Sequence, residues 1–246
     1  GIGRAIAERL AAEGARVTLV ARDASRLETV AGGIRRAGGE AQAIAADVAS
    51  APDVNAAAAG AAARFGPVTI LVNNAGIPGP YGPIDVVDPL AWWAAQAVNV
   101  LGPVLFMHAV IPGMRARRGG RIINIVSSAA VEPQVHLSAY AVSKNTLVRV
   151  TEHVDLEARG DGVRAFALHP GTITTDMASA TIDSPEAQRW VPGGVAMLKG
   201  RTDEESTRDL ARCCNVTAAL AAGRYDPLAG RYLDLWWDLD TQVTQA

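Results

Sequence analysis

Tyr140 and Lys144 are the residues whose types and spacing first suggest chemistry. They lie four positions apart in residues 138–159, a segment whose apolar pattern predicts a helix. Residues at i and i+4 share one helix face, so the phenol and the ammonium can point into the same cavity. A tyrosine of ordinary pKa, about 10, is a poor base at neutral pH, and a nearby lysine cation lowers that pKa. The pair therefore suits proton exchange with an alcohol oxygen while a hydride moves at the adjacent carbon.

A serine hydroxyl is expected to face this pair. The apolar, β-branched residues 121–126 predict a buried strand that stops at Ser127. At that strand end the hydroxyl can hold a substrate oxygen in line with the phenol. The spacing of Tyr140 and Lys144 is by itself more typical of an ordinary amphipathic pair on a helix surface, so other motifs must decide between the two interpretations.

Four further motifs accompany these residues. They are Gly1-Ile-Gly3, Asn73-Asn-Ala-Gly76, Asn99, and Pro170-Gly171 followed by Thr175. Ser127 also precedes Tyr140 by thirteen residues. In this order the chain resembles the short-chain dehydrogenase/reductase family over nearly its whole length. The resemblance implies a nicotinamide-dependent oxidoreductase that interconverts a carbonyl and an alcohol.

The resemblance also implies a role for each catalytic residue. Tyr140 would exchange a proton with the substrate oxygen, while Lys144 would lower the pKa of that phenol and hold the nicotinamide ribose. Ser127 would orient and polarise the carbonyl. Asn99 falls inside a predicted helix, residues 89–117, where asparagine costs roughly a few tenths of a kcal/mol relative to alanine. By the resemblance it bends the helix and holds a water that links the lysine to solvent, and the alternative is a hydrogen bond within its own helix turn.

The cofactor is expected in a crevice at the carboxyl ends of the strands. Glycines that open a helix, as Gly1 and Gly3 do, let the backbone approach a pyrophosphate at the helix N-terminus. The motifs and the resemblance assign cofactor binding to Gly1, Ile2, Gly3, Arg22, Asp47, Val48, Asn74, Ala75, Gly76, Tyr140, Lys144, Pro170, Gly171, Ile173 and Thr175. For Asp47 the alternative is a cap on a helix that begins near Pro52.

Arg22 bears on which nicotinamide cofactor is bound. The predicted strand at residues 17–21 ends at Ala21, where a protein that reads a free ribose 2′-hydroxyl would carry an acidic residue. Alanine removes the repulsion that an acid would exert on a 2′-phosphate, and the Arg22 guanidinium supplies a bidentate partner for one. NADP(H) is therefore favoured over NAD(H). The alternative is a solvated arginine beside Asp23, a helix-capping residue, in an NAD(H)-dependent alcohol dehydrogenase.

Alternating strands and helices must position these residues. Strands are predicted near residues 17–21, 41–46, 68–72, 121–126, 163–168 and 230–237, and helices near 1–14, 25–36, 56–65, 89–117, 138–159 and 203–221. The alternation predicts an α/β fold, a Rossmann-type doubly wound parallel sheet of about seven strands, in a single domain over residues 1–246. The resemblance requires a central strand and a first glycine ahead of Gly1, which this sequence lacks. We therefore expect a fragment of a longer gene product, in which two neighbouring strands have unpaired backbone groups.

Residues 176–201 contain small residues, prolines and apolar residues. They lie between the strand predicted at 163–168, whose end is expected to contact the cofactor, and the helix predicted at 203–221. A mobile lid over the substrate would lie in such a stretch, and the alternative is a plain surface excursion. His136 could face the substrate, because its loop lies between the catalytic serine and tyrosine. The other histidines, His108, His153 and His169, are expected to be packing residues.

Bulk composition limits the partners. The chain has 246 residues, 49% of them hydrophobic, a formal charge of −2 and no Lys/Arg run. No stretch is expected to approach the roughly 20 uncharged apolar residues of a membrane span, and no metal-ligand cluster is visible. We therefore expect a small-molecule substrate and neither a nucleic-acid nor a membrane partner.

Two adjacent pairs near the C-terminus complete the expectations. Cys213 and Cys214 cannot easily form an unstrained disulfide and fit a cytoplasmic location. Trp236 and Trp237 suggest burial against another subunit, and the resemblance implies a homodimer or homotetramer. A non-catalytic nucleotide-binding or scaffold domain is the alternative from another class, and it has no need of all four catalytic residues.

Overall fold

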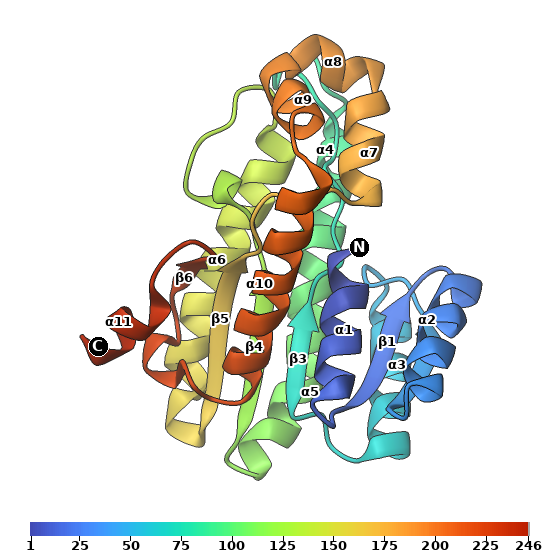
Figure 1. Cartoon of the computed structure of the whole chain (residues 1–246), viewed down its shortest axis with the longest axis vertical. Helices are drawn as coiled ribbons and strands as arrows, with labels where there is room; N and C mark the ends of the chain where they lie inside the picture. The colour runs from blue at the N-terminus through green and yellow to red at the C-terminus, as the bar shows by residue number, and fades with distance from the viewer. Residues whose placement is uncertain (246) are drawn as a thin grey trace.

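Six parallel strands in two sheets carry the fold of residues 1–245, which the computed structural model describes (Figure 1). In the first sheet β1 (Arg16–Ala21) pairs with β2 (Glu40–Ala45). The second sheet contains, in this order, β3 (Ile70–Asn73), β4 (Gly120–Ile125), β5 (Val163–His169) and β6 (Tyr232–Asp234). The predicted Rossmann-type α/β class is confirmed, with six strands among the described residues in place of about seven. Ala246, the last residue of the predicted domain, lies outside the described residues.

Helices join successive strands, as parallel pairing requires. These include α2 (Ala24–Arg36), α3 (Ala51–Phe65), α4 (Pro89–Gln96), α5 (Gly102–Ala116), α6 (Ser138–Ala158) and α10 (Asp203–Ala221). In addition, α1 (Ile2–Ala12) precedes β1 and α11 (Leu239–Thr244) follows β6. In Figure 1, α1 and α10 lie in front of the strands, whereas α5 and α6 lie behind them. α1 packs against α10, α5 against α3, and α6 along β5.

The central strands are buried on both faces, which explains their continuous apolar runs. Successive side chains of a strand point to opposite faces. On β4, Ile123 therefore packs with Cys213 and Leu220 of α10, while Ile122 packs with Met107 and Met114 of α5. Cys213 and Cys214 are free, buried thiols, in agreement with the expectation that they form no disulfide.

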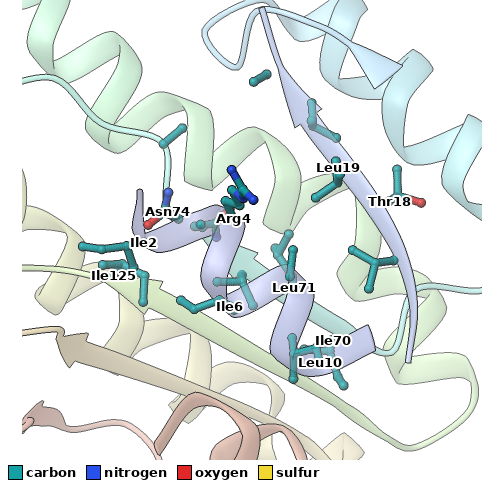
Figure 2. A pocket seen from close by; sticks show the side chains of 18 of the residues that line it. Ile2, Arg4, Ile6, Leu10, Thr18, Leu19, Ile70, Leu71, Asn74 and Ile125 are labelled. Carbon is teal, nitrogen blue, oxygen red and sulfur yellow. The ribbon is translucent and has the colours of Figure 1, made fainter. Parts of the chain in front are cut away.

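A cleft of about 1740 Å³, lined by apolar and polar side chains, separates the two sheets. Within residues 1–245, β1 and β3 share no strand pairing. Figure 2 shows Leu19 of β1 and Leu71 of β3 lining this cleft, together with Ile6 and Leu10 of α1. The expectation that two neighbouring strands have unpaired backbone groups is therefore confirmed.

The long helix predicted around Asn99 is interrupted. A π-helical turn, Ala97–Leu101, joins α4 to α5, and such insertions are frequent at functional sites. The whole run, Pro89–Ala116, is long and apolar enough to cross a membrane by length and composition, so the expectation that no stretch approaches such a span is wrong. Here the run packs against α3, α6 and the sheet.

Residues 176–201 are largely helical. They form α7 (Asp176–Asp183), α8 (Pro185–Trp190) and α9 (Pro192–Lys199), which gather at one end of the molecule in Figure 1. Proline occupies the first turn of α8 and of α9, where its missing N–H costs nothing. Each helix is too short for a periodic apolar pattern, which is why the sequence predicted no helix there.

The last strand is shorter than predicted. It ends at Asp234, whose carboxylate accepts a hydrogen bond of 2.9 Å from the Trp236 amide and so turns the chain. Trp236 and Trp237 lie in this turn and are 46% and 42% exposed in the single chain. The guanidinium of Arg212 lies 5.2 Å from the centre of a Trp236 ring.

Candidate active site

Ser127, Tyr140 and Lys144 lie together beyond the carboxyl end of β4. The Ser127 hydroxyl accepts a hydrogen bond of 3.2 Å from the Ala129 amide and caps a short 3₁₀ turn. Tyr140 and Lys144 lie in the first two turns of α6, with the lysine Nζ 5.6 Å from the centre of the tyrosine ring. The phenol also interacts with the Ser127 hydroxyl. The structure thus brings together three groups that the sequence predicted to meet.

Lys144 is a buried cation tied to the strand end. Its side chain is 4% exposed, and Nζ donates a hydrogen bond of 2.9 Å to the Ile125 carbonyl, the last of β4. Burial lowers the pKa of Lys144 from 10.5 to about 8, because an apolar surrounding penalises the charged form. The contact fixes α6 against β4 and sets the ammonium beside the phenol.

The net effect on Tyr140 differs from the expectation. Burial raises the pKa of Tyr140, and the hydrogen bond with Ser127 lowers it by less. The predicted lowering of this pKa by Lys144 is therefore not the net direction in the cofactor-free protein, because the desolvation of the phenolate dominates. A raised pKa keeps the phenol protonated at neutral pH and ready to donate.

Asn99 is fully buried in the π-helical turn and binds across the fold. Its Oδ1 accepts from the Ile77 amide at 2.8 Å, and its Nδ2 donates to the Ile77 carbonyl and to the Ser143 Oγ, both at 2.9 Å. The alternative that Asn99 bonds its own helix turn is therefore wrong. A Cβ on Gly76 would lie 3.3 Å from Asn99 Oδ1 and 3.5 Å from Lys144 Nζ, so both groups face the same bare backbone.

Sequence reasoning missed a buried chain of polar side chains below these groups. Asn73 Nδ2 donates to Asn124 Oδ1 at 2.7 Å, and Asn124 Nδ2 donates to Thr151 Oγ1 at 2.9 Å. Thr151 Oγ1 donates in turn to the Leu147 carbonyl at 2.7 Å. The chain links β3, β4 and α6, which carry the candidate site. An asparagine in the middle of a predicted fully buried strand was the signal that could have revealed it.

Most of the predicted cofactor residues line the cleft between the sheets. They are Gly1, Ile2, Gly3, Val48, Asn74, Ala75, Gly76, Tyr140, Lys144, Pro170 and Thr175. A Cβ on Gly3 would lie 2.6 Å from Asn74 Nδ2, so a side chain there would displace the Asn74 amide. The Thr175 hydroxyl accepts from the Ala178 amide at 3.2 Å and caps α7.

The other four predicted cofactor residues, Arg22, Asp47, Gly171 and Ile173, lie outside the lining of the cleft. Gly171 turns the chain with a φ of +82°, and Ile173 is buried in the main core. Asp47 receives a hydrogen bond of 2.9 Å from the Ala49 amide. Since Ser50 is the residue that caps α3, the alternative that Asp47 caps this helix is wrong.

Arg22 is exposed and has no hydrogen-bond or ion-pair partner within the described chain. Asp23 beside it caps α2 by accepting from the Arg26 amide at 3.0 Å. This arrangement matches the alternative of a solvated arginine beside a capping aspartate. Arg26, which the sequence did not single out, lines the cleft and pairs with Asp176 at the start of α7. That ion pair is exposed at both ends, so its contribution to stability is small.

The histidines differ in burial. His169 is buried at the end of β5, as expected for a packing residue. His108 on α5 and His153 on α6 are exposed, so the expectation that they are packing residues is wrong: each lies on the outer face of its helix. His136 directs its Nδ1 to the Trp190 carbonyl of α8, 2.8 Å away. Among residues 1–245, no three His, Cys, Asp or Glu side chains are grouped so as to hold a metal ion.

Comparison with known proteins agrees with this geometry. A family model described as short chain dehydrogenase matches residues 1–186. This chain belongs to the short-chain dehydrogenase family. It is therefore an NAD(P)-dependent oxidoreductase that acts on carbonyl or alcohol groups.

Relatives span most of the chain. A short chain dehydrogenase of Pseudocercospora fijiensis is 32% identical over 100% of this chain and 80% of its own length. A 2-(S)-hydroxypropyl-CoM dehydrogenase of Xanthobacter autotrophicus is 38% identical over 76% of this chain and 75% of its own. This chain is also similar to a gluconate 5-dehydrogenase from Burkholderia cenocepacia, whose crystal structure is a complex with NADP and tartrate. The two sequences are 30% identical, and the structures superpose with a TM-score of 0.80 over 100% of this chain and 92% of that one.

The buried Lys144 should make the cofactor-free protein gain stability between about pH 8 and pH 10.5. Its folded-state pKa of about 8 lies below the ordinary 10.5, so in this window the unfolded chain binds more protons and the free energy of unfolding rises with pH. Below pH 8 both states are protonated and the penalty for the buried charge is fully present. Relative to Lys144→Met, which keeps the apolar stem, the wild type should gain on the order of 3 kcal/mol across the window.

Urea unfolding of both proteins at several pH values measures this difference. Cys213, whose pKa is raised by burial to about 12, makes stability fall with pH, but it does so in both proteins and cancels. A difference that stays constant from pH 7.5 to pH 10.5 would show that Lys144 keeps an ordinary pKa.

Proposed function

We propose that the protein is an NADP(H)-dependent oxidoreductase that interconverts the carbonyl and the alcohol of a small molecule by hydride transfer. Its catalytic residues are Asn99, Ser127, Tyr140 and Lys144. The observation that carries the proposal is the meeting of the Ser127 hydroxyl, the Tyr140 phenol and the Lys144 ammonium beyond the end of β4, with the last two on the wall of the glycine-lined cleft.

The residues of the cleft fit a nicotinamide dinucleotide. Gly3 and Gly76 keep backbone bare at points where a Cβ would press on Asn74 or on the catalytic amide and ammonium. Arg22, which follows β1, supplies positive charge for a ribose 2′-phosphate, and Arg26 in the first turn of α2, paired with Asp176, adds a second guanidinium nearby. The gluconate 5-dehydrogenase of similar structure binds NADP. When bound, the cofactor supplies or accepts the hydride.

The protein residues donate the proton and stabilise the negative charge that it leaves behind. In the reductive direction the Tyr140 phenol, protonated because burial raises its pKa, donates to the carbonyl oxygen. The Ser127 oxygen accepts from the Ala129 amide, and its hydroxyl proton, which meets the Tyr140 phenol here, can turn to the same carbonyl and polarise it when substrate lies between the two groups. As negative charge develops on the phenol, the Lys144 ammonium stabilises it. Asn99 holds the π-helical turn through Ile77 and Ser143, and we expect it to keep a water there for proton exchange between Lys144 and solvent.

Replacing the phenol should remove the proton donor and leave the cofactor site intact. In Tyr140→Phe we expect turnover to fall by about 10³-fold, within the range for loss of a general acid, while NADPH affinity stays within about twofold. Tyr225→Phe, a matched loss of a hydroxyl in the segment after α10, should retain wild-type turnover. Carbonyl reduction followed by NADPH absorbance, and NADPH titration by fluorescence, measure the two quantities.

Two outcomes would contradict the catalytic assignment. Wild-type rates in Tyr140→Phe would refute the role of the phenol. Binding of NADPH by the wild type without oxidation or reduction across a broad carbonyl and alcohol panel would instead support a non-catalytic nucleotide-binding domain.

Arg22 decides between the two cofactors. Arg22 has no partner in the described chain, which leaves its guanidinium free for a 2′-phosphate. The same exposed position beside the cap Asp23 also matches a solvated arginine that binds no phosphate, so NAD(H) use is the second candidate. Loss of a bidentate phosphate contact in Arg22→Ala should lower kcat/KM for NADPH by about 10- to 100-fold and leave the value for NADH unchanged. Arg36→Ala, a matched charge loss at the far end of α2, should change neither. An unaltered cofactor preference in Arg22→Ala would exclude Arg22 as the phosphate reader.

We also propose that two or four copies associate through the outer face of α4, α5 and α6. Apolar side chains are exposed there: Leu90 by 79%, Trp93 by 67%, Leu101 by 44%, Val104 by 38% and Val142 by 45%. The first four recur at helical spacing along one run, and α4 packs against α6. Such a face on a single chain marks an interaction site.

A charge on this face should dissociate the assembly. Trp93→Asp is expected to shift the sedimentation coefficient to that of the monomer, whereas Leu156→Asp, an exposed apolar residue at the far end of α6, should not. A monomeric wild type at micromolar concentration would contradict the proposal.

A further inference from the structure

His136 connects the catalytic loop to the helices beside the candidate site. It lies in the segment between Ser127 and Tyr140, and its backbone φ is +61°. Its carbonyl accepts from the Gly82 amide at 2.9 Å, so two loops meet at this residue. Its side chain points to α8, where Nδ1 lies 2.8 Å from the Trp190 carbonyl and the two rings meet edge to face with centres 5.2 Å apart.

The hydrogen bond defines the state of the imidazole. A carbonyl only accepts, so Nδ1 must carry the proton whether or not Nε2 does. Trp190 is the last residue of α8, and the final carbonyls of a helix lack partners within the helix. His136 therefore satisfies an end carbonyl of α8 and at the same time fixes the position of its own ring.

Other contacts hold the same helices along their length. Tyr81 Oη and Thr181 Oγ1 are 2.7 Å apart, which joins the loop before α4 to α7. Tyr81, Ala187 and Val195 form an apolar cluster against which Leu137 and Trp190 pack. At the far end Arg201 pairs with Asp209, a fully buried carboxylate of α10. The contact of His136 with Trp190 is the polar link between the middle of α7–α9 and the segment that carries the catalytic residues.

We propose that His136 is a positioning residue that holds α7–α9 as a lid over the substrate beside Tyr140. The inference deepens the proposed function and rests on it. With the link intact the lid encloses the substrate, and without it α8 separates from the catalytic loop and the substrate escapes more readily. The reacting groups themselves are unchanged, so the effect appears as weaker retention of substrate and greater mobility of α8.

The positive φ allows a sharp choice of variants. His136→Asn tolerates this backbone conformation and presents an amide N–H near the position of Nδ1. His136→Gly removes the side chain and relieves the backbone, while His136→Ala removes the side chain and keeps the strain. A role of the side chain predicts that Gly and Ala are both impaired and that Asn rescues. A role of the backbone alone predicts that Ala, which keeps the same strain, stays close to the wild type and that Gly, which relieves it, differs.

The first readout requires no substrate. Amide hydrogen exchange of residues 184–199 should be faster by about tenfold in the Ala and Gly variants and within about threefold of wild type in Asn. Exchange in β4 and β5 should not change in any of the four proteins, which shows that the fold is retained. Equal exchange of residues 184–199 in all four proteins would overturn the proposal even if the protein is an active reductase.

The second readout is kinetic, with ethyl acetoacetate as the probe carbonyl and NADPH as the reductant. KM for the ester should rise by about tenfold in the Ala and Gly variants, kcat should change by less than about threefold, and NADPH affinity should be unaltered. An Asn variant as impaired as Ala, or a Gly variant like the wild type, would refute the link through the side chain. If the wild type itself leaves the ester unreduced, the proposed function fails for this substrate, and the exchange measurement still decides the role of His136.

Discussion

The arrangement of the candidate site depends on one buried contact, the hydrogen bond from the Lys144 ammonium to the Ile125 carbonyl. A cation that is taken out of water must be compensated by polar partners, and the last carbonyl of β4 supplies one at 2.9 Å. Because Ser127 follows two residues later and Tyr140 lies one turn earlier on α6, the same contact fixes the distance between hydroxyl and phenol. The lowered pKa of Lys144 is the energetic consequence of holding a charge at this depth.

Polar side chains in the core extend this constraint to the neighbouring elements. The chain Asn73–Asn124–Thr151 and the bonds of Asn99 to Ile77 and Ser143 satisfy buried groups that would otherwise destabilise the fold. Such bonds are directional, so they specify one register of β3 on β4 and one position of α6, whereas apolar packing alone would tolerate small shifts. The reacting groups are therefore carried by elements, β4 and α6, that buried hydrogen bonds hold in one relative position.

The two sheets carry different groups of the candidate site. The strands β3 to β6 and α6 hold the groups that exchange a proton, while β1, β2 and α2 present the arginines suited to a phosphate. α1 lies between the two sheets in Figure 1 and brings its glycine end to Asn74. The α7–α9 helices add a third part, held to the catalytic loop by His136 and to α2 by the exposed ion pair of Arg26 and Asp176.

The sequence by itself determined the α/β alternation, the family resemblance and the meeting of Ser127, Tyr140 and Lys144, because strand ends, helix faces and i,i+4 spacing are local properties. Only the tertiary structure decided the raised pKa of Tyr140, the partners of Asn99, the direction of His136 and the solvation of Arg22. Each of these depends on groups far away in the chain. Burial and hydrogen bonding between such groups are set when the elements pack, and no spacing within one segment records them.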